Sequence, residues 1–127
     1  MFATILACLI VGCVSFPSNP PSKGECGSPL PTNYEEIVEK SLKDLLIDPE
    51  SARFEFEVVR IGWKAVKSKP VGCYIIKVWV NAKNRMGGYS GKQPYWFAIR
   101  DGAIIGIATP EIIPQSDFNL PMPMWWN

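Results

Sequence analysis

The sequence predicts an α+β domain in which one N-terminal amphipathic helix packs on a four-stranded antiparallel β-meander, in two layers. Three observations lead to this fold class. Apolar residues recur at helical spacing after Thr32, they alternate with polar residues from Phe54 onward, and Asp101-Gly102 is a hairpin turn signal between two strand-like segments. A chain of 127 residues has room for one sizeable core, so a single domain is expected.

The helix is expected to begin near Thr32 and to end at Asp48-Pro49. Thr32 and Glu35 fit a capping box, in which the side chain of each binds the backbone amide of the other. The proline ends the helix, and Asp48 can cap a short second turn. The apolar stripe between these ends consists of Tyr34, Ile37, Val38, Leu42, Leu45 and Leu46.

Four strands are expected after the helix. The first covers 54–58, where Phe54, Phe56 and Val58 alternate with two glutamates. The others are Cys73 to Ala82, Tyr95 to Arg100 and Ala103 to Ala108. In the second strand one face is apolar, with Tyr74, Ile76, Val78 and Val80. Residues 62–72 are expected to form a basic connection, and residues 84–91 a glycine-rich loop.

The N-terminal residues 1–14 are uncharged and nearly all apolar. This run is shorter than the roughly 20 residues that span a bilayer, but it has the length of a signal-peptide core. It ends in Ile10-Val11-Gly12-Cys13, which resembles the lipobox of bacterial lipoproteins. The resemblance implies a signal peptide at 1–12, lipidation of Cys13 and a membrane anchor. The alternative is a buried N-terminal element with an ordinary core cysteine.

Three segments are expected after the signal peptide. Residues 13–31 combine the lipidated cysteine with a proline- and serine-rich tether, since the prolines exclude a helix and favour an extended spacer. Residues 32–113 form the globular domain, and 114–127 form a tail rich in proline, methionine and tryptophan. In Gram-negative lipoproteins an aspartate after the lipidated cysteine favours the inner membrane, so Val14 favours the outer membrane, with the domain in the periplasm or at the cell surface.

A second resemblance covers residues 40–102. It rests on Ser41-Leu42-Lys43-Asp44, on Asp48-Pro49-Glu50-Ser51-Ala52-Arg53-Phe54, and on Val80-Asn81-Ala82-Lys83-Asn84 with Gly87-Gly88-Tyr89-Ser90-Gly91. These segments resemble a group of small, mostly uncharacterised lipoproteins and secreted proteins of bacteria and phages. The resemblance implies a protein of the bacterial cell envelope and supplies no catalytic residue.

The four cysteines stand at positions 8, 13, 26 and 73. No Cys-x-x-Cys pair is present, so a zinc site is not expected. If residues 1–12 are removed and Cys13 is acylated, Cys26 and Cys73 remain as one pair. A disulfide between them is expected in an oxidising envelope. The alternative is two free thiols, one in a loop and one in the core.

Enzyme chemistry finds little support in the sequence. The chain has no histidine, which removes the commonest general base and metal ligand. It has no Ser-x-x-Lys or Gly-x-Ser-x-Gly motif, and Met86 and Gln93 break a phosphate-loop pattern around Gly91-Lys92. We therefore expect no catalytic residue, no metal and no cofactor. A carboxylate pair for glycoside hydrolysis is the alternative interpretation of Glu35, Glu36, Glu39, Glu55 and Glu57, which otherwise form solvated faces.

Charge is distributed unevenly along a chain whose net charge is only +1. Residues 58–100 contain nine basic and no acidic residues, with aromatic residues between them. They predict a surface for an envelope protein or an anionic glycan, and the envelope location excludes nucleic acid. The expected contact residues are Lys64, Lys67, Lys69, Arg85, Gly87, Gly88, Tyr89 and Lys92, and in the tail Trp125 and Trp126. Two alternatives stay open: acids and bases face each other, and the tail packs on its own sheet.

Together these patterns predict a non-enzymatic, lipid-anchored envelope protein that acts as a binding, assembly or exclusion module. One alternative is a small envelope enzyme or inhibitor that acts on cell-wall glycan. Another is a structural spacer between the membrane and the cell wall.

Overall fold

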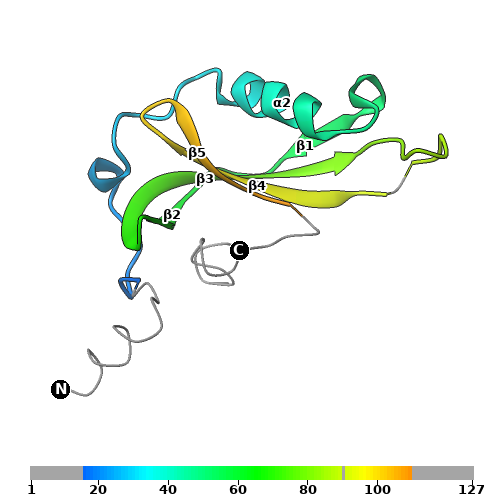
Figure 1. Ribbon diagram of the computed structural model, residues 1–127. Helices are drawn as coiled ribbons and strands as arrows, with labels where there is room; N and C mark the ends of the chain where they lie inside the picture. The colour runs from blue at the N-terminus through cyan, green and yellow to red at the C-terminus, as the bar shows by residue number, and fades with distance from the viewer. Residues whose placement is uncertain (1–15, 90, 110–127) are drawn as a thin grey trace, which may run out of the picture.

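An antiparallel sheet of five strands, with one α-helix on one of its faces, forms the centre of the computed structural model, which describes residues 16–89 and 91–109 (Figure 1). The α+β class is therefore confirmed. The elements in chain order are η1 (Lys23–Cys26), α2 (Tyr34–Leu45), η2 (Pro49–Ser51), β1 (Arg53–Phe56), β2 (Arg60–Val66), β3 (Lys69–Asn81), β4 (Gln93–Arg100) and β5 (Ala103–Ala108).

The long strand β3 organises the sheet. Both β1 and β2 pair with the same edge of β3, β1 along its C-terminal part and β2 along its N-terminal part. Strand β4 pairs with the other edge, and β5 follows β4. The expected meander of four strands is thus wrong in its count, because the first expected strand is divided into β1 and β2. Strand β2 extends into residues 62–72, which we expected to form a basic connection.

A β-bulge divides the first strand. Phe56 pairs with Val78, the amide of Glu57 donates to the carbonyl of Lys77 at 3.0 Å, and Arg60 then pairs with Ile75. Val58 and Val59 consequently oppose one residue of β3, which is the arrangement of a bulge. The extra residue reverses the alternation, so that Phe54 and Phe56 face α2 while Gly62 and Lys64 face the opposite side. Val58, which we expected on the apolar face, is 76% exposed.

The main core lies between α2 and the sheet. Val38 and Leu42 on the helix are fully buried, as the apolar stripe predicts. Tyr34 meets Phe56 edge to face, with 6.3 Å between the ring centroids. The sheet contributes Ile76, Val78, Val80, Ala82, Phe97 and Ile99. Leu45, at the last position of the helix, is exposed, whereas Leu46, directly after the helix, packs against the core.

The start of the helix differs from the expectation. The helix begins at Tyr34 after Asn33, and no side chain caps it, so the expected capping box of Thr32 and Glu35 is wrong. The short turn η2 follows Asp48 as expected, but the side chain of Asp48 makes no capping hydrogen bond. Nor is α2 the first packed element of the fold, because η1 precedes it.

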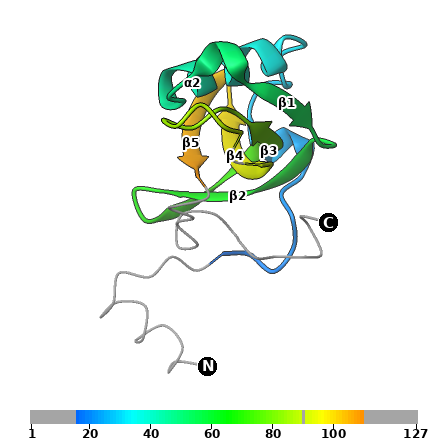
Figure 2. The same ribbon diagram turned by 90° about the vertical axis from the view of Figure 1, so that its right-hand side faces the viewer.

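A second, smaller core occupies the other face of the sheet, with Cys73, Ile75, Trp96, Ala98 and Ala108. A second bulge near Ala98 and Ile99 leaves Ile105 as the extra residue of β5. Both bulges lie next to Ile75 and Ala98, which pair with each other. Because bulges increase the local twist and bend strands, the sheet curls at this level. Figure 2 shows the outcome: β2 crosses beneath the other strands of the sheet.

Two tight turns close the hairpins. The turn from β4 to β5 is Asp101-Gly102, where both residues have positive φ, as the sequence predicts. The turn from β2 to β3 is Lys67-Ser68, which also has positive φ at both residues although neither is glycine. The second hairpin escapes sequence prediction because Lys-Ser carries none of the usual signals of such a turn.

The segment before the helix is docked on the sheet. Residues 19–28, called here the arm, include Pro21 and Cys26, which are both fully buried. The indole nitrogen of Trp63 donates to the carbonyl of Asn19 at 2.8 Å. The extended spacer that we expected up to residue 31 therefore does not describe this stretch.

Within residues 16–89 and 91–109, no helix has both the length and the apolar character that a membrane span requires.

Candidate functional site

The structure divides the expected contact residues into two groups. Lys67 and Lys69 lie at the turn that opens β3, whereas Arg85, Tyr89 and their neighbours lie in the loop that follows its end. The 13 residues of β3 would span roughly 40 Å if the strand were straight, at about 3.3 Å per residue. The basic residues of 58–100 therefore do not form one continuous surface.

Lys64 is not a surface loop residue. It lies in β2 with only 8% of its surface exposed, and its ammonium group donates to the carbonyl of Ala65 at 3.0 Å. The expectation that Lys64 reaches a partner from a loop is therefore wrong in its placement.

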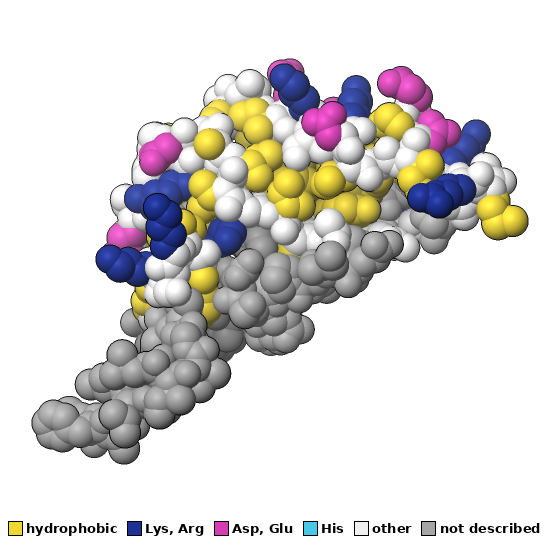
Figure 3. Space-filling view, in the orientation of Figure 1, with side chains coloured by type: hydrophobic (Ala, Val, Ile, Leu, Met, Phe, Trp, Pro, Cys, Tyr) yellow, Lys and Arg dark blue, Asp and Glu magenta, His cyan; other side chains and the backbone are white. Residues whose placement is uncertain are grey.

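Several bases are matched by acids within the chain. Lys77 lies 3.1 Å from Glu57, and Lys92 lies 2.6 Å from Glu55. Basic side chains are also interspersed with acidic ones on the face seen in Figure 3. Strand β1 brings acidic residues beside the basic strand β3, so the alternative in which acids and bases face each other describes this part of the molecule. In the described ranges no ion pair is formed by Lys67, Lys69 or Arg85.

The best candidate for a binding surface runs along β1 and the C-terminal part of β3, on the face opposite α2. We call it the outer strip and define it by Arg53, Glu55, Glu57, Lys77, Trp79, Asn81 and Lys92. The residues from each strand are spaced by two, which places them on one face of the sheet. The register pairs Glu55 with Trp79 and Arg53 with Asn81, so the two rows lie side by side.

Glu57, Lys77 and Trp79 form the centre of the outer strip. One carboxylate oxygen of Glu57 accepts from the indole nitrogen of Trp79 at 2.9 Å and lies 3.1 Å from the Lys77 ammonium. That ammonium also stands over the Trp79 ring, 4.6 Å from its centroid. Each side chain thus fixes the other two, so the indole is held in one orientation.

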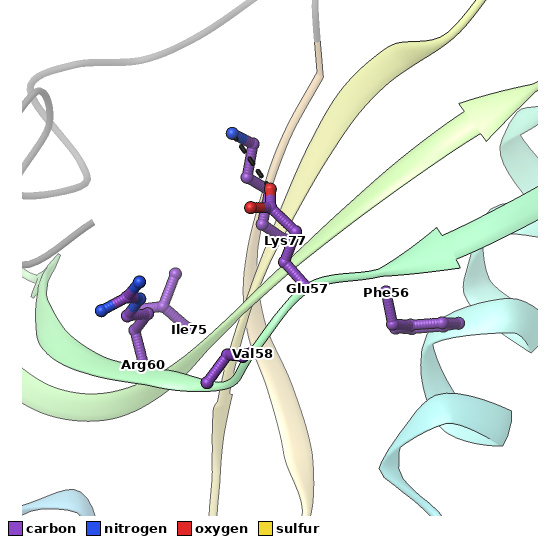
Figure 4. A pocket seen from close by; sticks show the side chains of 6 residues that line it. All are labelled: Phe56, Glu57, Val58, Arg60, Ile75 and Lys77. Carbon is purple, nitrogen blue, oxygen red and sulfur yellow. Dashed lines mark ion pairs between the residues drawn. The ribbon is translucent and has the colours of Figure 1, made fainter. Parts of the chain in front are cut away.

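A shallow hollow of about 260 Å³ adjoins this centre at the bulge between β1 and β2. Figure 4 shows Glu57 and Lys77 meeting on one side of it, with Arg60 and Ile75 close by, while Phe56 points away toward the helix. The bulge makes the hollow, because the strand leaves the edge of β3 between Glu57 and Arg60.

A second hollow of about 240 Å³ lies at the other end of the outer strip. It is lined by Arg53, Phe54, Glu55, Trp79, Asn81 and Lys92. Asn81 also has a buried side-chain oxygen, which accepts no hydrogen bond from the described chain. A buried acceptor without a donor costs about 1–3 kcal/mol, so the fold leaves one polar group of the outer strip unsatisfied at this end.

The glycine-rich loop closes this end of the outer strip. The side-chain oxygen of Asn84 accepts from the amides of Met86 and Gly88, which orders the loop. Tyr89 bonds through its hydroxyl to the carbonyl of Ser51, and the Arg53 guanidinium lies 4.9 Å from the Tyr89 ring centroid. Of the expected contact residues, Lys92 therefore belongs to the outer strip and Tyr89 adjoins it, with Gly87 and Gly88 in the same loop as Tyr89.

The sequence does not by itself bring the three central residues together into a site. The alternation of β3 places Lys77 and Trp79 on one face, which the sequence indicates. Their partner Glu57 depends on the register between β1 and β3, and the sequence alone does not define that register.

The arrangement offers little for hydrolysis. Glycoside hydrolysis needs a carboxylic acid beside a carboxylate. Here Glu55 and Glu57 are each bound to a lysine ammonium at the surface, with 62% and 43% of their side chains exposed. Among the described residues no group of three potential metal ligands comes together.

The two cysteines that we expected to pair are neighbours. The Cys26 thiol donates to the backbone carbonyl of Cys73 at 3.4 Å, and the Cys73 thiol donates to the carbonyl of Gly62 at 3.6 Å. Both are free thiols in this structure and both are fully buried. Burial raises the pKa of both thiols, that of Cys73 to about 12. The disulfide stays a prediction.

Cys13, Trp125 and Trp126 lie outside the described residues.

Comparison of the chain with protein-family models, with curated proteins and with solved structures found no match.

Proposed function

We propose that this protein is a non-enzymatic binding module of the bacterial cell envelope, anchored to the membrane by a lipid on Cys13, and that the outer strip receives its partner. The anchor rests on the lipobox-like Ile10-Val11-Gly12-Cys13 and on the apolar run before it. The partner surface rests on the geometry of the sheet.

One observation carries the binding proposal: Trp79 lines one hollow and is held by Glu57 and Lys77, which line the other. Binding sites commonly combine an apolar or aromatic wall with a few fixed polar groups. Tryptophan and arginine also contribute more than their share of binding energy at interfaces. Trp79, held by Glu57 and Lys77, has these properties and is already ordered before a partner arrives.

The charges favour a protein partner over an anionic glycan. A polyanion is attracted by cations that no acid neutralises, but Lys77 and Lys92 on the outer strip are bound to glutamates. A protein surface offers the mixed polar and apolar groups that match such a strip.

The two alternatives have less support. A glycan hydrolase would need a cleft with two carboxyl groups free for acid–base chemistry, and the outer strip ties its glutamates to lysines. A pure spacer has no use for an ordered tryptophan that lines a hollow.

The test is affinity capture of the lipidated protein from native membranes, with the captured proteins identified by mass. Trp79→Ala removes the indole, and Glu55→Lys reverses an exposed charge that contributes little to folding. Lys67→Glu combined with Lys69→Glu is the matched control, since it changes exposed charges at the opposite end of β3. Loss of one captured protein in both strip variants, with its retention in the control, supports the proposal. Equal capture by all variants would refute the outer strip as the partner surface.

A further inference from the structure

The arm, residues 19–28, is held on the sheet by contacts from three different strands. Besides the bond from Trp63 of β2, the Arg100 guanidinium of β4 donates to the carbonyls of Glu25 and of Gly72 in β3, both at 2.6 Å. At the turn after β4, the carboxylate of Asp101 accepts from the amide of Ser28 at 2.8 Å. Arg100 thus joins the backbone of the arm directly to the backbone of β3.

The arm also fits closely against β3. A β-carbon at Gly72 would come within 2.5 Å of the Glu25 carbonyl oxygen and 3.1 Å of Pro21. Only glycine leaves room for the backbone of the arm at this point, so β3 is shaped to receive it.

Cys26 stands in this contact, at the last position of η1. It is fully buried, and its thiol lies against the backbone of Cys73, which follows Gly72 on β3. Two residues that lie 47 positions apart in the chain are therefore brought together by the docking of the arm. Their closeness is a consequence of the fold and not of local sequence.

We propose that Cys26 and Cys73 are joined by a disulfide in the mature protein, and that this bond latches the arm onto β3. The reaction removes two protons and two electrons from the two thiols. The oxidant is the disulfide of a thiol–disulfide oxidoreductase: one cysteine attacks it to form a mixed disulfide, and the second cysteine then displaces the enzyme as its dithiol.

Burial determines when the bond forms. Both thiols are sealed inside the folded protein, and the thiolate that exchange requires is disfavoured there because burial raises the pKa of both. An oxidoreductase can reach Cys26 and Cys73 only while the arm is lifted. The latch therefore closes as the chain folds, and it does not open and close in the folded protein.

The latch changes the distance between the anchor and the domain, a consequence that rests on the proposed lipidation of Cys13. With the arm free, the chain from Cys13 to the helix at Tyr34 can span at most about 70 Å. With the arm docked from Asn19 onward, the remaining chain can span at most about 20 Å. The arm thus holds the domain close to the membrane surface.

The bond is tested on the mature full-length protein purified from bacterial envelopes without reductant. We expect that after denaturation Cys26 and Cys73 resist alkylation until reductant is added, and that a peptide map finds their two peptides linked. Alkylation of both cysteines in the denatured protein without reductant would overturn the proposal. Cys26→Ser is the matched control, in which Cys73 should react on denaturation alone. A Cys13→Ser variant that keeps the linked peptides shows that the disulfide forms without the lipid anchor, so the two proposals are tested independently.

The latch itself is tested by amide hydrogen exchange at Ser28, whose N–H is bound to Asp101. Exchange there should be at least tenfold slower in the oxidised protein than in the same protein after reduction, because the bond keeps the arm docked. Reduced wild-type protein serves as the comparison if Cys26→Ser fails to fold. Equal exchange rates in the two forms would show that the bond does not latch the arm.

Discussion

The side chain of Lys64 in β2 lies against Gly106 in β5, although β3 and β4 separate these two strands in the sheet. A β-carbon on Gly106 would overlap the Cε of Lys64. The contact is possible because the sheet curls at its two bulges, which brings β2 beneath the far edge of the sheet. The aliphatic part of Lys64 therefore covers the small core around Cys73, Ile75 and Ala98.

This contact predicts that Gly106→Ala is destabilising. The added methyl group has to displace a buried side chain, and overpacking of this kind costs about 1–3 kcal/mol. The free energy of unfolding, measured by chemical denaturation, should fall by that amount. Gly88→Ala is the control, because open space surrounds Gly88, and it should change stability by less than about 0.5 kcal/mol.

A double-mutant cycle tests whether the displaced Lys64 side chain causes the destabilisation by Gly106→Ala. In a Lys64→Ala background the side chain that Gly106→Ala displaces is gone, so the second substitution should be nearly neutral. The two effects should then be non-additive by about 0.5–3 kcal/mol. Strict additivity would show that Lys64 and Gly106 do not touch in solution.

Periodicity predicted the parts of this fold that depend on local sequence. The apolar stripe located the helix with its buried residues Val38 and Leu42, and alternation located β3 with Ile76 and Val78 facing it. Asp101-Gly102 identified the last hairpin because this dipeptide adopts positive φ readily.

The remaining features of the fold depend on tertiary contacts, and local sequence patterns give only weak signals for them. The bulge at Val58 and Val59 is defined by pairing with β3, and both valines match an uninterrupted strand. The arm is rich in proline and glycine, which is typical of a loop, yet its backbone groups find partners in Arg100, Asp101 and Trp63. The outer strip likewise depends on register, because Glu57 meets Lys77 and Trp79 only when β1 is placed beside β3.

The main core predicts a large effect for Leu42→Ala. Leu42 is fully buried between α2 and the sheet, and truncation of a buried leucine costs about 2–5 kcal/mol through lost transfer energy and the cavity that remains. The midpoint of chemical denaturation should fall accordingly. Lys43→Ala, on the exposed side of the same helix, should leave the midpoint almost unchanged; a similar loss in both variants would contradict the packing described here.

The lipid anchor predicts that Cys13→Ser releases the protein from the membrane. Without the cysteine there is no acceptor for the acyl chains, each of whose buried CH₂ groups contributes about 0.8 kcal/mol to membrane binding. After fractionation, the wild type should be found with the membranes and the variant in the soluble fraction. A variant that stays with the membranes and keeps residues 1–12 would contradict the lipoprotein interpretation.

The contact between the arm and the last hairpin predicts a carboxyl with an unusually low pKa. The backbone amide of Ser28 holds the pKa of Asp101 below its usual 3.8, chiefly by donating a hydrogen bond to the carboxylate, and the nearby Arg100 acts in the same direction. A lowered pKa means that the charged form favours the docked arm. This contribution is complete above the usual pKa near 3.8 and is lost as the pH falls through the lowered value.

An NMR titration checks this prediction between pH 5 and the acid limit of folding. The Asp101 carboxyl should titrate below 3.8, and the Ser28 amide shift should follow the same curve. Asp101→Asn should abolish the step at Ser28 while preserving the turn, since asparagine also accepts positive φ. Ser28→Ala keeps the backbone amide and should retain most of the lowering. A carboxyl that titrates at 3.8 or above in the wild type would show that the arm does not rest on Asp101 in solution.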